Sequence, residues 1–194
     1  MAGSANENGG KKNHNLNEAK NRKPGFSLIE LLIVVAIILI IASIAIPNLL
    51  RAKIAANQSA AVQALRTMTS AEQTFSSTYS DGYTLTLAQL GGPVGSRSCV
   101  NAGLIDEVLS SAPSQKGGYT YTFTPNGNAA LTLGIPAACG VSGDSGYSIS
   151  ATPVSLGTTG SASYCVDETG VIRFNTAGVL IPPPCASSGY PPLQ

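Results

Sequence analysis

The chain has 194 residues, and only 11% of them are charged. This length allows one domain with an extended element, or two small domains. The formal net charge of +1 hides an asymmetry, because residues 1–25 carry five basic and two acidic side chains while the remainder carries six basic and eight acidic ones. No basic patch remains after residue 25, which argues against general nucleic-acid binding as the main role.

A polar leader, residues 1–25, opens the sequence. It is rich in Asn, Lys and Gly and has no helical or strand periodicity, so we expect it to be disordered before it is removed by processing. His14, the single histidine of the chain, lies in this leader. The mature protein would therefore have no histidine for a catalytic triad or a metal site.

An apolar run follows the leader, since Leu31 to Leu50 are 20 residues without a charge. A helix of this length covers about 30 Å, the hydrocarbon thickness of a bilayer. The basic leader is expected to stay in the cytoplasm while later residues cross the inner membrane. A secretory signal peptide ending near Ser43-Ile44-Ala45 is one alternative, although its apolar region is usually about 7–15 residues. An uncleaved single-pass anchor is another.

The junction before this run is Gly25-Phe26-Ser27-Leu28-Ile29-Glu30, and it follows the basic residue Lys23. The apolar span after it carries Pro47. In this register the segment resembles the cleavage and methylation motif of type IV prepilins, and the resemblance is strong over residues 23–79. It implies that prepilin peptidase, a membrane enzyme, cuts after Gly25 and methylates the new N-terminal Phe26.

The helical pattern continues beyond the apolar run. Residues 51–79 are rich in Ala and Gln, and their large apolar side chains recur every three or four residues. No Gly occurs between Gly25 and Gly82. We therefore predict one helix from about Phe26 to about Tyr79, ending at the turn signal Ser80-Asp81-Gly82. The predicted parts are the leader 1–25, a transmembrane and assembly half 26–50, an amphipathic half 51–81, and a periplasmic or extracellular β domain 82–194.

Short strands and turns are predicted after Gly82. Leu85–Gly95 is interpreted as a connecting loop and Leu104–Leu109 as a short helix. Alternating aromatic and hydroxyl residues indicate half-buried strands, and turns at Pro125-Asn126-Gly127 and at 167–170 predict two hairpins. The predicted strands are Tyr119–Phe123, Ala130–Leu133, Tyr147–Ala151, Ser163–Val166 and Val171–Phe174. They would form an antiparallel sheet of four or five strands over one helix face, in an order left open. The expected class is α+β, and the resemblance implies the type IV pilin fold.

Four cysteines, Cys99, Cys139, Cys165 and Cys185, lie on the translocated side. They have no Cys-x-x-Cys spacing, so disulfides in an oxidising periplasm are favoured over zinc. The sequence alone allows three connectivities. Resemblance to pilins, which often close a C-terminal loop in this way, favours Cys165–Cys185 and leaves Cys99–Cys139.

No residue pattern predicts an enzyme, a metal site or a cofactor. Asp106-Glu107 and Asp167-Glu168 are adjacent carboxylates, and both pairs are interpreted as solvated surface because neighbours in sequence point apart. Asp144 lies among Gly and Ser, but one carboxylate without a series of oxygen ligands is a weak indication of a calcium site. The sequence therefore predicts a structural protein.

The expected role is that of a prepilin whose mature form polymerises into a pilus filament. Its partners would be other copies of itself and a pilus assembly platform. The resemblance implies that Glu30 pairs with the N-terminal amine of a neighbouring subunit, and Pro47 is expected to weaken the helix for assembly. A pseudopilin of a type II secretion system shares the motif. A monomeric, membrane-anchored binding module is the alternative from another class.

Overall fold

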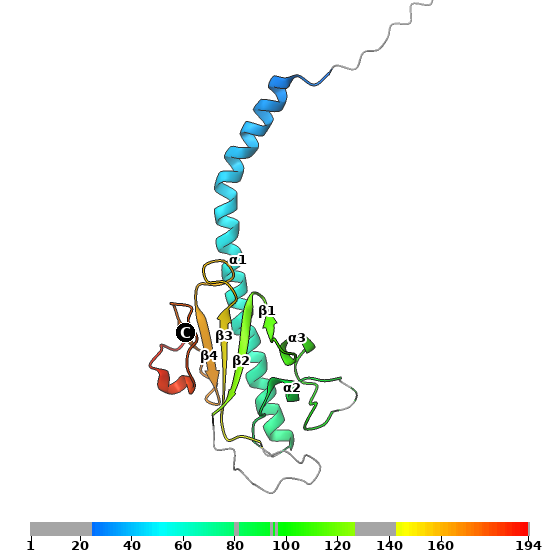
Figure 1. Cartoon of the computed structure of the whole chain (residues 1–194), viewed down its shortest axis with the longest axis vertical. Helices are drawn as coiled ribbons and strands as arrows, with labels where there is room; N and C mark the ends of the chain where they lie inside the picture. The colour runs from blue at the N-terminus through cyan, green and yellow to red at the C-terminus, as the bar shows by residue number, and fades with distance from the viewer. Residues whose placement is uncertain (1–24, 80–81, 94, 96, 127–142, 194) are drawn as a thin grey trace, which may run out of the picture. The chain divides into compact units, whose positions relative to one another are not determined.

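One long helix, α1 (Leu28–Tyr79), occupies the N-terminal part of the described chain. The structure, a computed structural model, describes residues 25–79, 82–93, 95, 97–126 and 143–193. Contacts divide the chain into two units with a boundary between Ala42 and Ser43, and α1 belongs to both (Figure 1). The helix begins two residues after the predicted start and ends at the predicted residue, Tyr79.

In the first unit, α1 exposes apolar side chains on all sides. Every residue from Leu28 to Ile41 is exposed, and the large aliphatic side chains of this stretch are at least 46% accessible. Among the described residues, α1 is the one helix long and apolar enough to cross a membrane. A helix of this composition is stable in a bilayer or among similar helices, because each exposed aliphatic side chain is costly in water.

In the second unit, one face of α1 forms the core with the residues that follow. Ala61, Leu65, Met68 and Phe75 follow one another at intervals of four, three and seven residues, which places them on one helix face, and they are at most 2% exposed. Complete burial of a large apolar side chain contributes roughly 1.5–3 kcal/mol. Packing of this stripe therefore fixes the outer half of α1 to the β domain.

The sheet contains five antiparallel strands whose spatial order follows the chain, β1-β2-β3-β4-β5. β2 and β3 pair along their full length, from Tyr119↔Pro153 to Pro125↔Tyr147. β4 and β5 form the hairpin predicted around residues 167–170. The strands are β1 (Gln115–Lys116), β2 (Tyr119–Pro125), β3 (Tyr147–Pro153), β4 (Ser163–Asp167) and β5 (Arg173–Asn175). The α+β class and the five-stranded antiparallel sheet confirm the predicted fold.

Local predictions needed correction at two short helices. Residues 85–95, expected to be loop, contain α2 (Leu87–Leu90), which begins with a capping box between Thr86 and Gln89. The helix expected at 104–109 is α3 (Glu107–Ser110), because the Asp106 side chain accepts a hydrogen bond from the Leu109 amide and so marks the helix start. The predicted strand 130–133 and its turn residue Gly127 lie outside the described residues.

Candidate functional site

The Gly25–Phe26 junction lies before the first residue of α1. Both residues are exposed, Phe26 to 78%, and a β-carbon placed on Gly25 would meet no atom within 4 Å. A peptidase must reach both faces of the peptide bond that it cuts, and a helix would hide one of them. The structure therefore leaves the predicted scissile bond accessible.

Glu30 takes part in the N-terminal cap of α1. Its Oε2 accepts a hydrogen bond from the Ser27 N–H at 3.0 Å, and the Leu31 N–H donates to the Ser27 carbonyl at 3.2 Å. Ser27 is thus the N-cap and Glu30 the third helical residue, and the bond from the Ser27 amide is one of the two bonds of a capping box. The carboxylate also lies at the helix end where negative charge is favourable. Sequence reasoning missed this role, although the Ser-x-x-Glu spacing signals it.

Pro47 lies inside α1, and helix is assigned on both sides of it. Proline has no N–H, so Pro47 donates no hydrogen bond to the preceding turn. The large apolar side chains around it, Ile44, Ile46 and Leu49, are at least 64% exposed. In the single chain, α1 therefore continues as a helix through Pro47 although the hydrogen bond that a residue at this position usually donates is missing.

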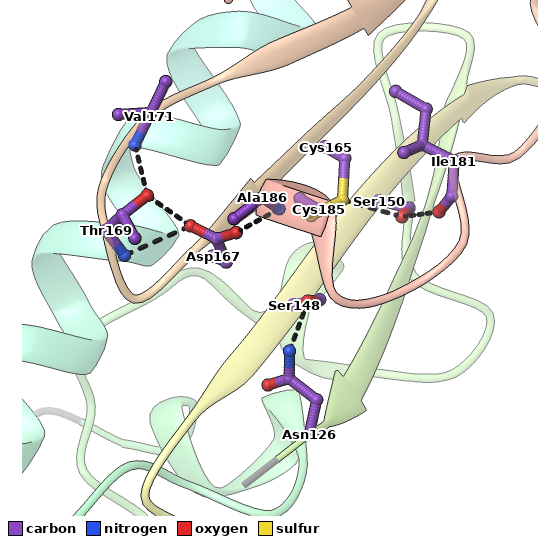
Figure 2. Close-up of a disulfide and its surroundings, with 10 residues drawn as sticks. All are labelled: Asn126, Ser148, Ser150, Cys165, Asp167, Thr169, Val171, Ile181, Cys185 and Ala186. Atoms are coloured by element: carbon purple, nitrogen blue, oxygen red, sulfur yellow. Dashed lines mark hydrogen bonds between the residues drawn. A yellow bond between two sulfur atoms is a disulfide. The ribbon is translucent and has the colours of Figure 1, made fainter. Parts of the chain in front are cut away.

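A disulfide joins Cys165 of β4 to Cys185 of the 3-10 helix η1 (Cys185–Ser188), with a Cα–Cα distance of 5.8 Å (Figure 2). This is the pair that the resemblance implies. Both cysteines are fully buried. The Ser150 hydroxyl of β3 donates to the Ile181 carbonyl at 3.1 Å, so the C-terminal segment is held to two strands. Cys99 is also disulfide-bonded, and Cys139 lies outside the described residues.

Asp167 contradicts the interpretation of its carboxylate pair as solvated surface, because its side chain is buried. Its carboxylate accepts hydrogen bonds from the Thr169 amide at 3.1 Å and from the Ala186 amide at 2.7 Å (Figure 2). It thereby joins the β4–β5 turn to η1, and it lies two residues after the disulfide cysteine Cys165 on the same strand. Asp106 and Glu107 are exposed, as expected, and Asp106 forms an ion pair with Lys116.

Glu72 is a fully buried carboxyl on the apolar face of α1. Its oxygens accept hydrogen bonds from the amide of Thr84, at 3.0 Å, and from the Thr84 hydroxyl. Burial raises the pKa of the Glu72 carboxyl from 4.5 to about 7, although the Thr84 hydrogen bonds act in the opposite direction. Sequence reasoning missed this site. Its signal was an acidic residue placed four positions after Met68 and three before Phe75, on the predicted apolar stripe.

Asp144 has a structural role in the described chain. Its backbone exchanges hydrogen bonds with that of Tyr83, at 2.8 and 2.9 Å. Its Oδ1 accepts from the Gly146 amide at 3.2 Å. Together with the Glu72–Thr84 contact, this bridge fixes the segment after α1 to both the helix and the start of β3.

Comparison with known protein families identifies one match. The prokaryotic N-terminal methylation motif covers residues 20–46, which include Gly25, Phe26 and Glu30. Curated proteins and solved structures give no match.

Proposed function

Because residues 20–46 carry the signature of type IV pilin and pseudopilin precursors, we propose that this chain is the precursor of a pilus subunit. Prepilin peptidase cuts it after Gly25 and methylates Phe26, and the mature chain then polymerises into an extracellular filament. The observation that carries this proposal is the methylation motif at residues 20–46, which includes the start of α1, where residues 28–41 expose apolar side chains on all sides.

The apolar half of α1 would occupy two environments in succession. As a precursor it spans the inner membrane, with its leader in the cytoplasm and the β domain on the far side. In the filament the same side chains pack against equivalent helices of other subunits. Both environments remove the exposed aliphatic surface of residues 28–41 from water, so extraction from the membrane need not expose it.

Glu30 would set the axial position of each subunit. Cleavage creates an α-amino group on Phe26, and no basic side chain lies between Lys23 and Arg51. Two opposite charges about 4 Å apart gain roughly 4 kcal/mol at an effective dielectric of 20, whereas an unpaired buried carboxylate is costly. The Ser27 cap supports a pair with the α-amino group of a neighbouring subunit, because it fixes the Glu30 carboxylate in one position at the start of α1.

The decisive experiment is mass spectrometry of filaments sheared from cells that express this chain. We expect their main subunit to be Phe26–Gln194 with one added methyl group on Phe26. A subunit that retains the leader, or that begins after Ala45, would contradict the processing. A protein absent from surface filaments but required for export of secreted enzymes would instead be a pseudopilin of a type II secretion system.

A further inference from the structure

Two segments of the β domain that lie against each other carry four exposed aliphatic side chains. They come from the loop after β3 and from the segment before η1, and we call them the proximal patch: Val154, Leu156, Val179 and Leu180, which are 54, 59, 61 and 46% exposed. The two segments touch, because a β-carbon on Gly178 would lie only 2.2 Å from Leu156 Cδ1. Exposed aliphatic side chains that cluster, rather than scatter, mark an interaction surface.

The patch lies at the end of the domain that is nearer to residues 43–50, the part of the apolar run that belongs to the same unit. The Asn57 side-chain amide donates to the Thr159 carbonyl at 2.9 Å, and the Gln58 amide donates to the Ser161 hydroxyl at 2.8 Å. These contacts fix the β3–β4 loop to α1, beside which it lies in Figure 1. Asn57 follows Leu50 by seven residues, or about 10 Å along a helix. The loop is therefore fixed to α1 about 10 Å along the helix from the residue at which the apolar run ends.

Charge at this end of the domain suits an anionic surface. The loop 154–161 and the segment 178–181 contain no charged residue. The first charged residues after the apolar run are Arg51 and Lys53, which are exposed. The first carboxylate after Glu30 in the sequence is Glu72. A surface that presents both aliphatic side chains and exposed cations binds at the surface of anionic phospholipids.

We propose that the proximal patch rests on the phospholipid surface of the membrane that holds the apolar run. This inference depends on the membrane anchoring in the proposed function and adds a second contact to it. Arg51 and Lys53 lie at the level of the lipid phosphates, and the patch side chains enter the headgroup region beside them. The anchored β domain is then held in one orientation, and this contact must break when the subunit leaves the bilayer.

The chain has no Trp, so single Trp substitutions report on their own surroundings. We would reconstitute full-length Val179→Trp and Leu156→Trp proteins in phosphatidylcholine and phosphatidylglycerol vesicles whose acyl chains are brominated near the headgroup. The matched control is Val171→Trp. Ser163, at the start of β4, donates its hydroxyl to the Val179 carbonyl, whereas Val171 follows the turn at the other end of β4 and is also partly exposed. Ile44→Trp, in the apolar run, reports on anchoring itself.

We expect the Val179→Trp and Leu156→Trp reporters to lose fluorescence in brominated vesicles, and the Val171→Trp control to keep it. Quenching of Ile44→Trp without quenching of either patch reporter would overturn the proposal and leave the anchoring intact. An unquenched Ile44→Trp would show that the apolar run does not lie in the bilayer, which would contradict both the anchoring and the proposal. A patch reporter whose emission shifts with the protein-to-lipid ratio, without quenching, would show that a second copy covers the patch instead.

Discussion

At the scale of single residues, the Glu30 side chain supplies both a hydrogen-bond acceptor and a charge. The acceptor caps α1 through the Ser27 amide at 3.0 Å. Gln at the third helical position serves the same capping box, whereas Ala does not. Substitutions at this position can therefore separate the cap from the charge.

We expect Glu30→Ala and Glu30→Gln subunits to be processed and inserted in the membrane but to assemble poorly. Glu30→Asp should give a partial defect, because it keeps the charge on a shorter side chain. The measurement is an immunoblot of membrane and sheared surface fractions. Normal filament numbers for Glu30→Ala, in cells without another pilin, would remove Glu30 from the mechanism. Normal numbers for Glu30→Gln alone would make the cap, and not the charge, the requirement.

Glu72 predicts a dependence of stability on pH. Its pKa is about 7 in the fold, above the unfolded value of 4.5, so the folded chain binds the extra proton between these values. The stabilisation is complete below the unfolded pKa and is lost as the pH rises through about 7. The whole shift corresponds to about 3 kcal/mol.

Glu72→Gln mimics the protonated side chain. We expect its free energy of unfolding, relative to that of the unsubstituted protein, to increase by up to about 3 kcal/mol as the pH rises from about 5 to about 8. Denaturant unfolding in detergent micelles measures the difference. Glu107→Gln, which removes an exposed carboxylate, is the control. A constant difference between the Glu72→Gln and unsubstituted proteins across this pH range would show that Glu72 does not bind the proton.

At the scale of elements, the disulfide holds η1 to the sheet by closing a loop of 20 residues between Cys165 and Cys185. In the chain-entropy model, such a loop closure stabilises a fold by roughly 3 kcal/mol. We expect Cys165→Ala/Cys185→Ala to lower the free energy of unfolding by about this amount and to reduce subunit abundance without preventing membrane insertion. Unfolding curves of the two proteins test this. Coincident curves would mean that the Asp167–Ala186 bond and packing hold η1 unaided.

Pro47 is expected to weaken the helical hydrogen bonding of α1 in the filament. A proline inside a regular helix costs about 3 kcal/mol, and the β-branched Ile residues before it lower helix propensity. We expect the backbone between Leu39 and Pro47 to loosen when subunits pack. A filament map with continuous hydrogen-bonded helix through 43–47 would contradict this expectation.

The elements show where sequence patterns are informative. β2, β3 and β4 were predicted because alternating side chains and tight turns are local signals. The long helix was predicted because its apolar positions repeat every three or four residues. The site of Asp167 was not predicted, because its partner, the Ala186 amide, is distant in sequence. The place of Glu72 on the apolar stripe signals its burial, but not its partner, the Thr84 amide, which lies across a loop. A local pattern of acidic residues carries no information about such partners.

At the scale of the whole molecule, the proposed cleavage would change the charge distribution of the chain. The leader carries the excess of basic residues, and the mature part is slightly acidic. We expect Gly25→Val to block the cut, because a branched side chain crowds the peptide bond that the peptidase must approach. Intact mass of the membrane form should then show the uncut chain. A mature mass for this variant would mean that Gly25 does not determine cleavage.

The strand order also has a consequence for how the domain acquires its shape. Each described strand pairs with the next one along the chain, and none is inserted between two earlier strands. Near-neighbour pairing keeps loop-closure costs low and favours rapid folding. If the β domain crosses the membrane beginning with the residues after α1, as proposed, it can therefore add strands to one growing edge. Cys185 follows every described strand in the chain, so its bond to Cys165 can form only after all of those strands have emerged.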